Sequence, residues 1–365
     1  MTQHTSFRIA VLPGDGIGIE VIDAALEVLN AAQEKAGGYR LNLESLPAGA
    51  GEYVTNGVAL PEDTLKAAEE SDAILLGAMG LPSVRYPDGT EIAPQLDLRF
   101  HFNLYAGVRP SMTFANGPSA LVDPRGGDIN FVLIRESTEG LFASRGKGVV
   151  VDDREARDTL VITRDTSERL FDFSFELARQ RKAQGHPGHV TLVDKANVFT
   201  SFAFFREIFD ERAANYPDIG SDHLYVDATA LDMVRRPWEF DVLVTENMFG
   251  DILSDLAAGL VGGMGFAPSA DIGDNNAVFQ PAHGTAPDIM GTGKANPVAC
   301  ILSAAMMLDW LGAKHDTPGC LRAAQLIKDA VAITISEKGI KTADVGGSHS
   351  TSDVVRAVVD AIAEA

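Results

Sequence analysis

Residues 9–20 read IAVLPGDGIGIE, an apolar strand-like run that passes through three glycines into a helical pattern. Many α/β proteins bind a dinucleotide at such a junction. The G-x-G-x-x-G fingerprint, however, needs its third glycine at position 19, which is an isoleucine. No acidic residue stands clearly at the end of a second strand about 20 positions further on. The stretch therefore indicates an α/β fold, and any nucleotide must be held by another route.

The same alternation continues along the chain and predicts layers of helices on a largely parallel sheet. The clearest strand-like runs are 8–12, 73–77, 131–134, 190–193, 224–226 and 242–245. Helical periodicity covers 22–32, 165–184, 298–312, 321–337 and 352–363. Gly37 and Gly38 stop the first of these helices, and Asp165 is the expected N-cap of the second.

The composition bounds the class of protein. The 365 residues include 51 acidic and 30 basic ones, for a net charge of −21. A field of this sign repels nucleic-acid phosphates and anionic membranes, so neither is an expected partner. Cys300 and Cys320 lie in apolar helical patterns and are predicted to be core thiols in a reducing compartment. No apolar run reaches the roughly 18 residues that span a bilayer, and no signal-peptide pattern is present, so we expect a cytoplasmic protein.

Two aspartates lie four residues apart in the segment 245–260, TENMFGDILSDLAAGL. On a helix, Asp251 and Asp255 project from one face, where like charges repel unless a cation lies between them. Carboxylate oxygens suit Mg²⁺ or Mn²⁺. A solvated helix face is the alternative, although the apolar, glycine-dotted segment favours a metal site. Asp227 ends the strand-like HLYVD at 223–227 and is a further candidate, because α/β proteins place ligands at strand ends.

A long glycine- and proline-rich loop covers 280–297, QPAHGTAPDIMGTGKANP. Its backbone N–H groups could bind phosphates, and His283, Thr285, Asp288 and Asn296 are its polar side chains. Asp288 could accept from ribose hydroxyls and would repel a 2′-phosphate. An ordinary surface loop is the alternative, because loops are rich in these residues.

Four basic residues stand beside strand-like runs. Arg99, Arg109 and Arg135 carry the planar fork that binds a carboxylate, although each could instead form a surface ion pair. Lys195 follows a strand, where burial and neighbouring cations could lower its pKa into the range of a general base. A solvated lysine is the alternative.

Taken together and in this order, the segments resemble the β-decarboxylating dehydrogenases, the family of isocitrate, isopropylmalate and tartrate or D-malate dehydrogenases. The similar segments are VLPGDGIG, LRF with GVRP, RESTEG, VDKANV, VDATA, NMFGDILSDLA and PAHGTAPDIMGTGKANP. The resemblance implies an isopropylmalate dehydrogenase-like two-domain α/β fold with a large mixed sheet, which is not a Rossmann fold. One domain would comprise 1–104 plus 262–365, and the other 105–261, with the substrate cleft between them.

The resemblance also implies roles for individual residues. Arg99, Arg109 and Arg135 would clamp the carboxylates of a malate-type hydroxy acid. Asp227, Asp251 and Asp255 would hold Mg²⁺ or Mn²⁺. Lys195 would be the base at the C2 hydroxyl, with hydride passing to NAD and the β-carboxylate leaving as CO₂. Lys195 and Asp227 would reach the site from the partner of a homodimer. The expected cofactor-binding residues are Ile17, His283, Gly284, Thr285, Ala286, Asp288 and Asn296.

Two positions depart from the family pattern. The family motif R-E-x-T-x-G-x-Y ends in a tyrosine that helps to protonate the enol, whereas this chain has Phe142. The segment that reads the substrate's 3-substituent, 92–96, carries Ile92, Ala93 and Gln95. The Gln95 amide would lose water against an isopropyl group without gaining a partner. We therefore expect a smaller or more polar substituent, as in tartrate or D-malate.

Two other functions remain open. Phe142 favours a non-decarboxylating 2-hydroxy-acid dehydrogenase on the same fold. A catalytically silent, ligand-binding relative is the other alternative, and it is disfavoured by the presence of Lys195 with every expected arginine and aspartate.

Overall fold

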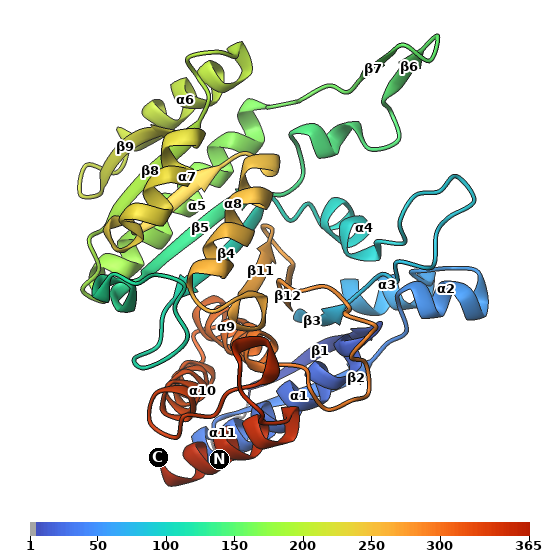
Figure 1. Ribbon diagram of the computed structural model, residues 1–365, viewed down its shortest axis with the longest axis vertical. Helices are drawn as coiled ribbons and strands as arrows, with labels where there is room; N and C mark the ends of the chain where they lie inside the picture. Colours follow the sequence, from blue (N-terminus) through green and yellow to red (C-terminus); the bar gives the residue numbers. More distant parts are fainter. Residues whose placement is uncertain (1–4) are drawn as a thin grey trace.

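The computed structural model describes residues 5–365 and contains one ten-stranded mixed sheet (Figure 1). The strand order is β2-β1-β3-β12-β11-β4-β5-β10-β8-β9. Neighbours pair parallel except at the centre, where β12-β11, β11-β4 and β4-β5 are antiparallel. The strands are β1 Thr5–Gly14, β2 Tyr39–Ser45, β3 Ala73–Ala78, β4 Ala106–Met112, β5 Asn130–Glu136, β8 His189–Asp194, β9 Gly220–Tyr225, β10 Val242–Thr245, β11 Pro268–Ile272 and β12 Ala277–Pro281. The predicted mixed α/β sheet is confirmed.

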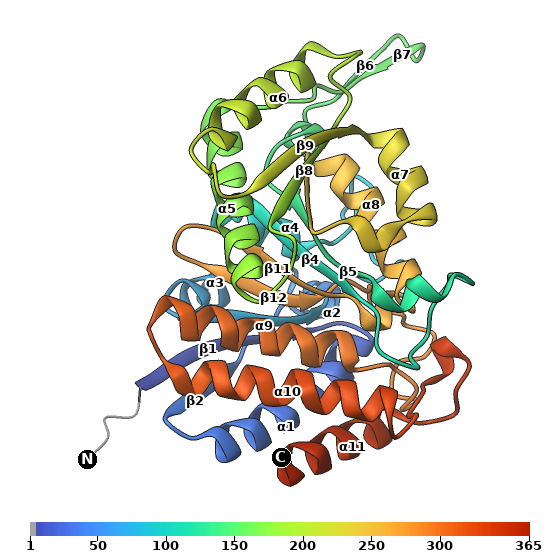
Figure 2. The same cartoon turned by 90° about the vertical axis from the view of Figure 1, so that its left-hand side faces the viewer.

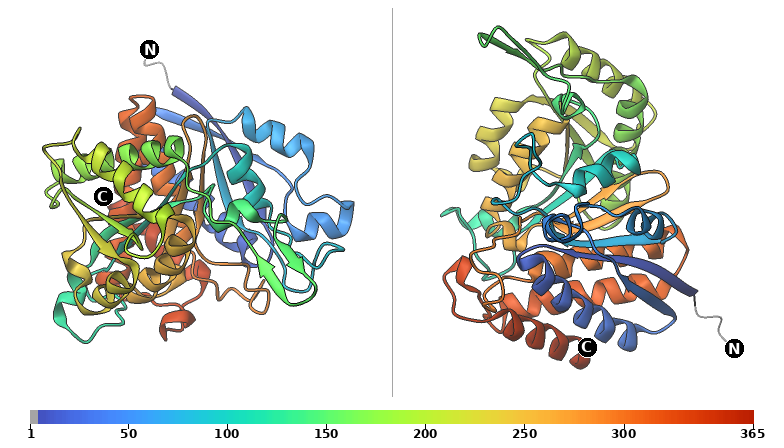
Figure 3. Two further views of the ribbon diagram at one scale, coloured as in Figure 1. Left: turned by 90° about the horizontal axis from the view of Figure 1, so that it is seen from above. Right: turned by 90° about the vertical axis from the view of Figure 1, so that its right-hand side faces the viewer.

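Helices cover both faces of the sheet. One face, turned to the viewer in Figure 2, carries α1 Ile17–Ala36, α5 Arg164–Ala183, α6 Thr200–Ala213, α9 Val298–Lys314, α10 Pro318–Ser336 and α11 Thr351–Glu364. The opposite face, seen in the right panel of Figure 3, carries α2 Ala50–Asn56, α3 Glu62–Glu69, α4 Pro94–His101, α7 Val226–Arg235 and α8 Asn247–Leu260. A separate hairpin of β6 Val149–Val151 and β7 Glu155–Arg157 extends from the body.

Side-chain alternation along the central strands decides which residues face α4 and α8. In β4 and β5, Val108 and Val132 belong to the core under α5 and α9. Successive side chains of a strand point to opposite faces, so Arg109 and Arg135 face α4 and α8 instead. Asp271 in β11 alternates in the same way with the buried Ala270. The sheet therefore presents charged side chains from three neighbouring strands to one side.

The opening glycine stretch joins three distant segments by backbone contact. A Cβ on Gly14 would lie 2.0 Å from the Ala78 carbonyl oxygen, and one on Gly16 would lie 2.0 Å from that of Thr285. The Ile17 N–H donates to the Thr285 carbonyl at 2.8 Å. These glycines thus allow the β1–α1 turn to touch β3 and the loop after β12, a role different from the dinucleotide fingerprint.

Helix boundaries match the periodicity at most ends and differ at two. The predicted helices at the C-terminal end correspond to α9, α10 and α11, and Gly37 is the C-cap of α1. Helix α5 begins at Arg164 with Thr163 as N-cap, so Asp165 lies in its first turn and the predicted N-cap is wrong. Strand β9 ends at Tyr225, so Asp227 lies in the first turn of α7 rather than at a strand end.

The predicted domain division follows the order of the sheet. Strands β2 to β11 in that order come from 1–104 plus 262–365, and strands β4 to β9 come from 105–261. Their separation into two units that move stays a prediction. Cys300 and Cys320 are buried and unpaired, as expected for core thiols. Within residues 5–365, no helix combines the length and the apolar character that a membrane crossing needs.

Candidate active site

The three predicted arginines meet on the α4 and α8 side of the sheet. Arg99 comes from α4, Arg109 from β4 and Arg135 from β5, and all three are buried. Arg99 Nε and Arg109 Nη2 each lie 3.0 Å from a carboxylate oxygen of Asp271. Arg135 donates to Asn247 Oδ1 from Nε at 2.9 Å and from Nη2 at 2.7 Å. The structure thus brings the predicted arginines into one cluster.

The guanidinium groups affect one another electrostatically. Burial, together with the positive charges of Arg99 and Arg109, lowers the pKa of Arg135 to about 10 against the opposing effect of Asp251. Guanidiniums are rarely perturbed so far, because they are among the most basic groups in proteins. Burying like charges together is costly unless an anion compensates them. The cluster is therefore chemically suited to bind an anionic ligand.

Helix α8 passes directly over this cluster and brings two predicted metal ligands beside it. A Cβ on Gly250 would lie 2.6 Å from Arg135 Cγ, so the helix can cross here only with a glycine. One residue later, Asp251 forms an ion pair with Arg135 Nη1. Asp255 lies one turn further, and its pKa is raised by partial burial and by the repulsion of Asp251. The predicted like-charge pair on one helix face is confirmed.

Lys195 and Asp227 form a second cluster. Lys195 directly follows β8, and its Nζ donates to Asp227 Oδ1 at 2.5 Å. This hydrogen bond lowers the pKa of Asp227. Among residues 5–365, no group of three His, Cys, Asp or Glu side chains converges well enough to hold a metal ion. A single chain therefore does not bring Asp227 to Asp251 and Asp255.

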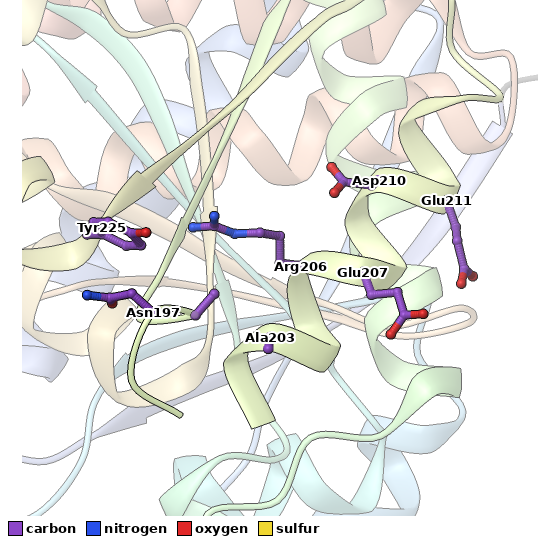
Figure 4. Close-up of a pocket in the computed structure, with 8 residues that line it drawn as sticks. Asn197, Ala203, Arg206, Glu207, Asp210, Glu211 and Tyr225 are labelled. Carbon is purple, nitrogen blue, oxygen red and sulfur yellow. The ribbon is translucent and has the colours of Figure 1, made fainter. Parts of the chain in front are cut away.

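The loop that carries Lys195 is held by a buried ion pair. Asp194 is fully buried and accepts from Arg206 Nε and Nη2, both at 2.7 Å, and from the Ala196 N–H at 2.9 Å. Arg206 in turn lies 5.3 Å from the centre of the Tyr225 ring. Figure 4 shows Arg206 extending from α6 towards Tyr225 across a pocket of about 570 Å³ that Asn197 also lines. These contacts fix the backbone on either side of the lysine.

The predicted cofactor loop lies against the first glycine turn. Ile17 and Thr285 share the backbone hydrogen bond described above, and Thr285 Oγ1 donates to the Gly80 carbonyl at 2.6 Å. Ala286 adopts a positive φ of 36°, which few residues with a Cβ adopt. Gly284 and Asp288 are exposed beside it. The structure therefore places these predicted residues on one surface beside the start of α1.

Two further loop residues have constrained side chains. Asn296 donates from Nδ2 to Asp344 at 3.1 Å and accepts the Val298 N–H at 3.1 Å, so it holds the loop to the start of α9. His283 has a buried Nε2 without a partner in the described residues. Burial lowers the pKa of His283, which favours the neutral ring at pH 7. This nitrogen therefore has unused hydrogen-bonding capacity.

The predicted specificity segment divides between core and cleft. Ile92 is fully buried and packs with Ala50 and Ala59. Gln95 lies in the first turn of α4, four residues before Arg99, and its Oε1 is buried without a partner among residues 5–365. Phe142 lies with its ring centre 5.0 Å from the Arg135 guanidinium. The ring thus borders the arginine cluster, as expected for the position of the family tyrosine.

Sequence reasoning missed three polar residues at the site. Asp271 and Asn247 accept hydrogen bonds from the arginine side chains, and Gln280 Nε2 donates to Asp271. Asn247 sits in the quoted helix segment, four residues before Asp251, and that spacing is the one signal that could have identified it. Asp271 lies inside a strand and carries no motif, and Gln280, the first residue of the quoted segment 280–297, lies in β12 rather than in a loop.

Comparison with known proteins agrees with this geometry. The family model described as isocitrate/isopropylmalate dehydrogenase matches residues 8–358. The chain is 41% identical to the 3-isopropylmalate dehydrogenase of Desulfotalea psychrophila, over 98% of this chain and 99% of that one. It is 40% identical to the 3-isopropylmalate/3-methylmalate dehydrogenase of Methanocaldococcus jannaschii, over 98% and 99%.

Solved structures of related proteins are also similar to this chain in fold. The isocitrate dehydrogenase of Methylococcus capsulatus superposes with a TM-score of 0.82 at 37% identity, covering 99% of both chains. The β-decarboxylating dehydrogenase of Thermococcus kodakarensis superposes with a TM-score of 0.78 at 38% identity, covering 98% of this chain and 96% of that one. The chain therefore belongs to the isocitrate/isopropylmalate dehydrogenase family, and it is an oxidoreductase of the β-decarboxylating dehydrogenase type that acts on CH–OH groups.

Proposed function

We propose that this chain oxidises a (2R)-malate-type 2-hydroxy acid with NAD⁺ and releases the β-carboxylate as CO₂. The observation that carries the proposal is the buried cluster of Arg99, Arg109 and Arg135. Guanidinium forks match carboxylates in geometry, and the cost of holding them together falls when an anionic substrate enters. A small hydroxy-dicarboxylate has two such groups.

The aspartates of α8 fit a divalent metal ion. Asp251 and Asp255 offer hard oxygen donors one helical turn apart, and the pKa of Asp255 is raised by partial burial and by the repulsion of Asp251, which a cation would relieve. Asp227 would complete the ligand set from the partner subunit. Mg²⁺ or Mn²⁺ would supply positive charge at the substrate's C2 oxygen. Arg135, which is paired with Asp251 here, would then be free to bind a carboxylate.

Lys195 is the proposed base at the C2 hydroxyl. Its ammonium group donates to Asp227. Asp227 would hold the metal ion, and the Lys195 Nζ would then be free to face the C2 hydroxyl. The Asp194–Arg206 pair holds the loop while this happens.

The loop from His283 to Asn296 is the proposed NAD site, with Ile17 and the start of α1 beside it. NAD⁺ would supply the hydride acceptor. Asp288 is exposed, so its carboxylate can accept from ribose hydroxyls and would repel a 2′-phosphate. The buried and unpartnered His283 Nε2 offers a further contact. This arrangement favours NAD over NADP.

The active unit is proposed to be a homodimer with shared sites. Within the described part of one chain, Asp227 does not converge with Asp251 and Asp255. The apolar side chains Leu231 of α7 and Ile252 of α8 are 55% and 62% exposed. A second copy of the chain packed here would cover them and bring Lys195 to the partner's metal ligands.

Subunit complementation tests this sharing. Lys195→Met and Asp251→Asn homodimers are each expected to be inactive. After denaturation and refolding of an equal mixture, about a quarter of the wild-type activity should return, because half of the dimers are mixed and each has one intact site of two. Mixtures that remain inactive although mixed dimers form would contradict a shared site.

Gln95 supports a substrate with a polar or small 3-substituent. Its Oε1 is buried without a partner among residues 5–365, and a buried polar group of this kind gains when a ligand supplies a donor. A substrate hydroxyl would do so, as in tartrate, and D-malate would leave room for water. An isopropyl group would leave the oxygen unpaired.

The decisive experiment measures NADH and CO₂ together. The purified protein is incubated with NAD⁺ and Mn²⁺ and a panel of D-malate, tartrate isomers, isopropylmalate and isocitrate. Equal yields with D-malate or a tartrate would support the whole proposal. Preference for isopropylmalate would contradict the proposed substituent while keeping the reaction.

A second function has one observation in its favour. Phe142 lies beside Arg135 and has no hydroxyl proton to give. A non-decarboxylating dehydrogenase would produce NADH without CO₂ in the same assay. Binding of the acids without any NADH would instead indicate a catalytically silent relative.

A further inference from the structure

The arginine cluster encloses one carboxylate that the proposed reaction does not use. Asp271 lies in the middle of β11 and is fully buried. Its Oδ2 accepts from Arg99 Nε at 3.0 Å and from Gln280 Nε2 at 2.9 Å. Its Oδ1 accepts from Arg109 Nη2 at 3.0 Å. One carboxylate is thus held by donors from α4, β4 and β12.

The charge of Asp271 is permanent. Burial alone would raise the pKa of Asp271, but Arg109 and Arg99 outweigh burial and lower the pKa to about 2. The carboxylate therefore stays ionised at any physiological pH. The three guanidiniums and this carboxylate together carry two net positive charges, with Asp251 set aside because the proposed function assigns it to the metal.

Asp271 also determines which edge of each guanidinium stays available. Arg99 uses only Nε for Asp271, and neither of its terminal nitrogens has a hydrogen-bond partner among the described residues. Arg109 is fixed further by its Nη1, which donates to the backbone oxygens of Ala270 at 2.9 Å and Val108 at 3.2 Å. Arg109 is therefore the immobile member of the pair, and Arg99 offers the open fork.

We propose that Asp271 is a positioning residue that holds Arg99 and Arg109 ready for the substrate and restricts the site to dicarboxylates. The inference rests on the proposed function and names what excludes larger substrates. Two carboxylates neutralise the two net charges of the cluster. A third carboxylate, as in isocitrate, would enter without a counter-charge, and burying an uncompensated charge is strongly unfavourable. Arg145, a nearby cation on the Gln95 side, is already paired with Asp97 at 3.3 Å.

An exchange across the Asp271–Gln280 hydrogen bond tests the proposal. Asp271→Asn removes the negative charge, and the double variant Asp271→Asn/Gln280→Glu returns it to the position 2.9 Å away. The dissociation constants of D-malate and isocitrate are measured by calorimetry with Mg²⁺ present. In the single variant, the preference for D-malate over isocitrate should fall by about tenfold or more, because one charge acts at short range in a buried site. The double variant should restore the preference.

A matched control separates positioning from general stability. Asp241 is also a fully buried aspartate paired with an arginine, Arg181 Nε at 2.6 Å, but it lies at the start of β10. Asp241→Asn should lower thermal stability and leave the ratio of the two dissociation constants unchanged. A ratio that shifts equally in Asp241→Asn, or that stays lowered in the double variant, would overturn the proposal.

The experiments distinguish failure of the proposed reaction from failure of the proposed role of Asp271. A wild type that binds D-malate in calorimetry but reduces no NAD⁺, with an Asp271→Asn variant whose preference falls, would refute the reaction and keep the role of Asp271. A wild type that oxidises D-malate, with an Asp271→Asn variant of unchanged preference, would refute the role and keep the reaction. A folded Gln280→Glu single variant gives a further check if Asp271→Asn does not fold. Its second negative charge should weaken D-malate binding by about tenfold.

Discussion

The arginine cluster and the Lys195–Asp227 cluster are built in opposite ways. The side chains of Arg99, Arg109 and Arg135 are 9%, 8% and 5% exposed, and each has a fixed partner from another element. The side chain of Asp227 is 70% exposed, and among residues 5–365 the Lys195 ammonium has Asp227 as its hydrogen-bond partner and the Tyr225 ring centre 5.8 Å away. One chain therefore completes the arginine cluster, which is the proposed substrate-binding half of the site, and leaves the proposed catalytic half exposed. Binding and turnover should accordingly respond to different changes.

The largest expected effect comes from Lys195. Lys195→Met should lower kcat by about 10²- to 10⁴-fold, because a general base contributes in that range. The Kd of D-malate should stay within about threefold of the wild type, because the arginine cluster is untouched. Steady-state kinetics and calorimetry measure the two quantities. Lys182, which donates to the Asp218 carbonyl outside the cleft, gives a control variant, Lys182→Met. An equal loss of binding and turnover in Lys195→Met would show that the halves are not separate.

Arg135 should show the reverse pattern. Arg135→Met should lower kcat/KM by about 10²- to 10³-fold through the loss of a buried carboxylate partner. The lowered pKa of Arg135 shows that burial and the charges of Arg99 and Arg109 disfavour its charged form. Removing this guanidinium relieves that unfavourable interaction, so thermal stability should fall little. The control is Arg181→Met, which takes a partner from the buried Asp241 and should cost about 3 kcal/mol or more in unfolding free energy. Differential scanning calorimetry compares the thermal stabilities of Arg135→Met and Arg181→Met. A larger loss in Arg135→Met would contradict repulsion within the arginine cluster.

Glu136, which follows Arg135 in β5, should make the unfolding free energy of the protein depend on pH. Burial raises the pKa of Glu136 from 4.5 to about 7. The folded state then holds this proton to higher pH than the unfolded state, so the contribution of Glu136 is most favourable below pH 4.5 and declines until about pH 7. Gln cannot ionise, so the unfolding free energy of Glu136→Gln relative to the wild type should rise from pH 5 to pH 8 by up to about 3 kcal/mol. Urea unfolding at both pH values measures this difference, and parallel pH profiles would contradict it.

The smallest expected effect concerns Phe142. Phe142→Tyr places a hydroxyl beside Arg135, where a proton donor for the enol belongs if the family pattern holds. The ratio of CO₂ to NADH should rise or stay at one, and the rate should change by no more than about tenfold. Phe114→Tyr, in the core away from this site, is the control. A fall in the ratio would show that the wild-type chain finishes the reaction through another group that the new hydroxyl disturbs.

Much of the fold was predictable because local patterns and tertiary structure agree. The apolar runs of β1, β3 and β10 and the periodicity of α9 and α10 each point to the observed element. The errors arose where two local signals compete. Val226 extends an apolar run and reads as strand, yet it opens α7, so Asp227 was placed at a strand end. Asp165 resembles an N-cap, yet Thr163 two residues earlier has the extended backbone that a cap requires.

The site was predictable only where residues stand in a motif. Asp251 and Asp255 share a helix face, and their spacing is enough to group them. Asp271 binds Arg99 across 172 residues of sequence, and nothing local marks a single aspartate in an apolar strand as the partner of an arginine. The separation of Asp227 from Asp251 is likewise invisible in a linear pattern, because it depends on how α7 and α8 pack against each other.

The position of β12 in the sheet has a consequence for synthesis. β3 ends at Ala78 and pairs with β12, which begins at Ala277. Gly16 likewise contacts the backbone of Thr285, which follows β12 in the sequence. About 200 residues must be translated between the two strands, which at roughly 5–20 residues per second takes about 10 to 40 seconds. Throughout that time, β3 exposes an unpaired apolar edge on the ribosome. The emerging N-terminal third therefore keeps one edge of β3 without its native partner until β12 has been made.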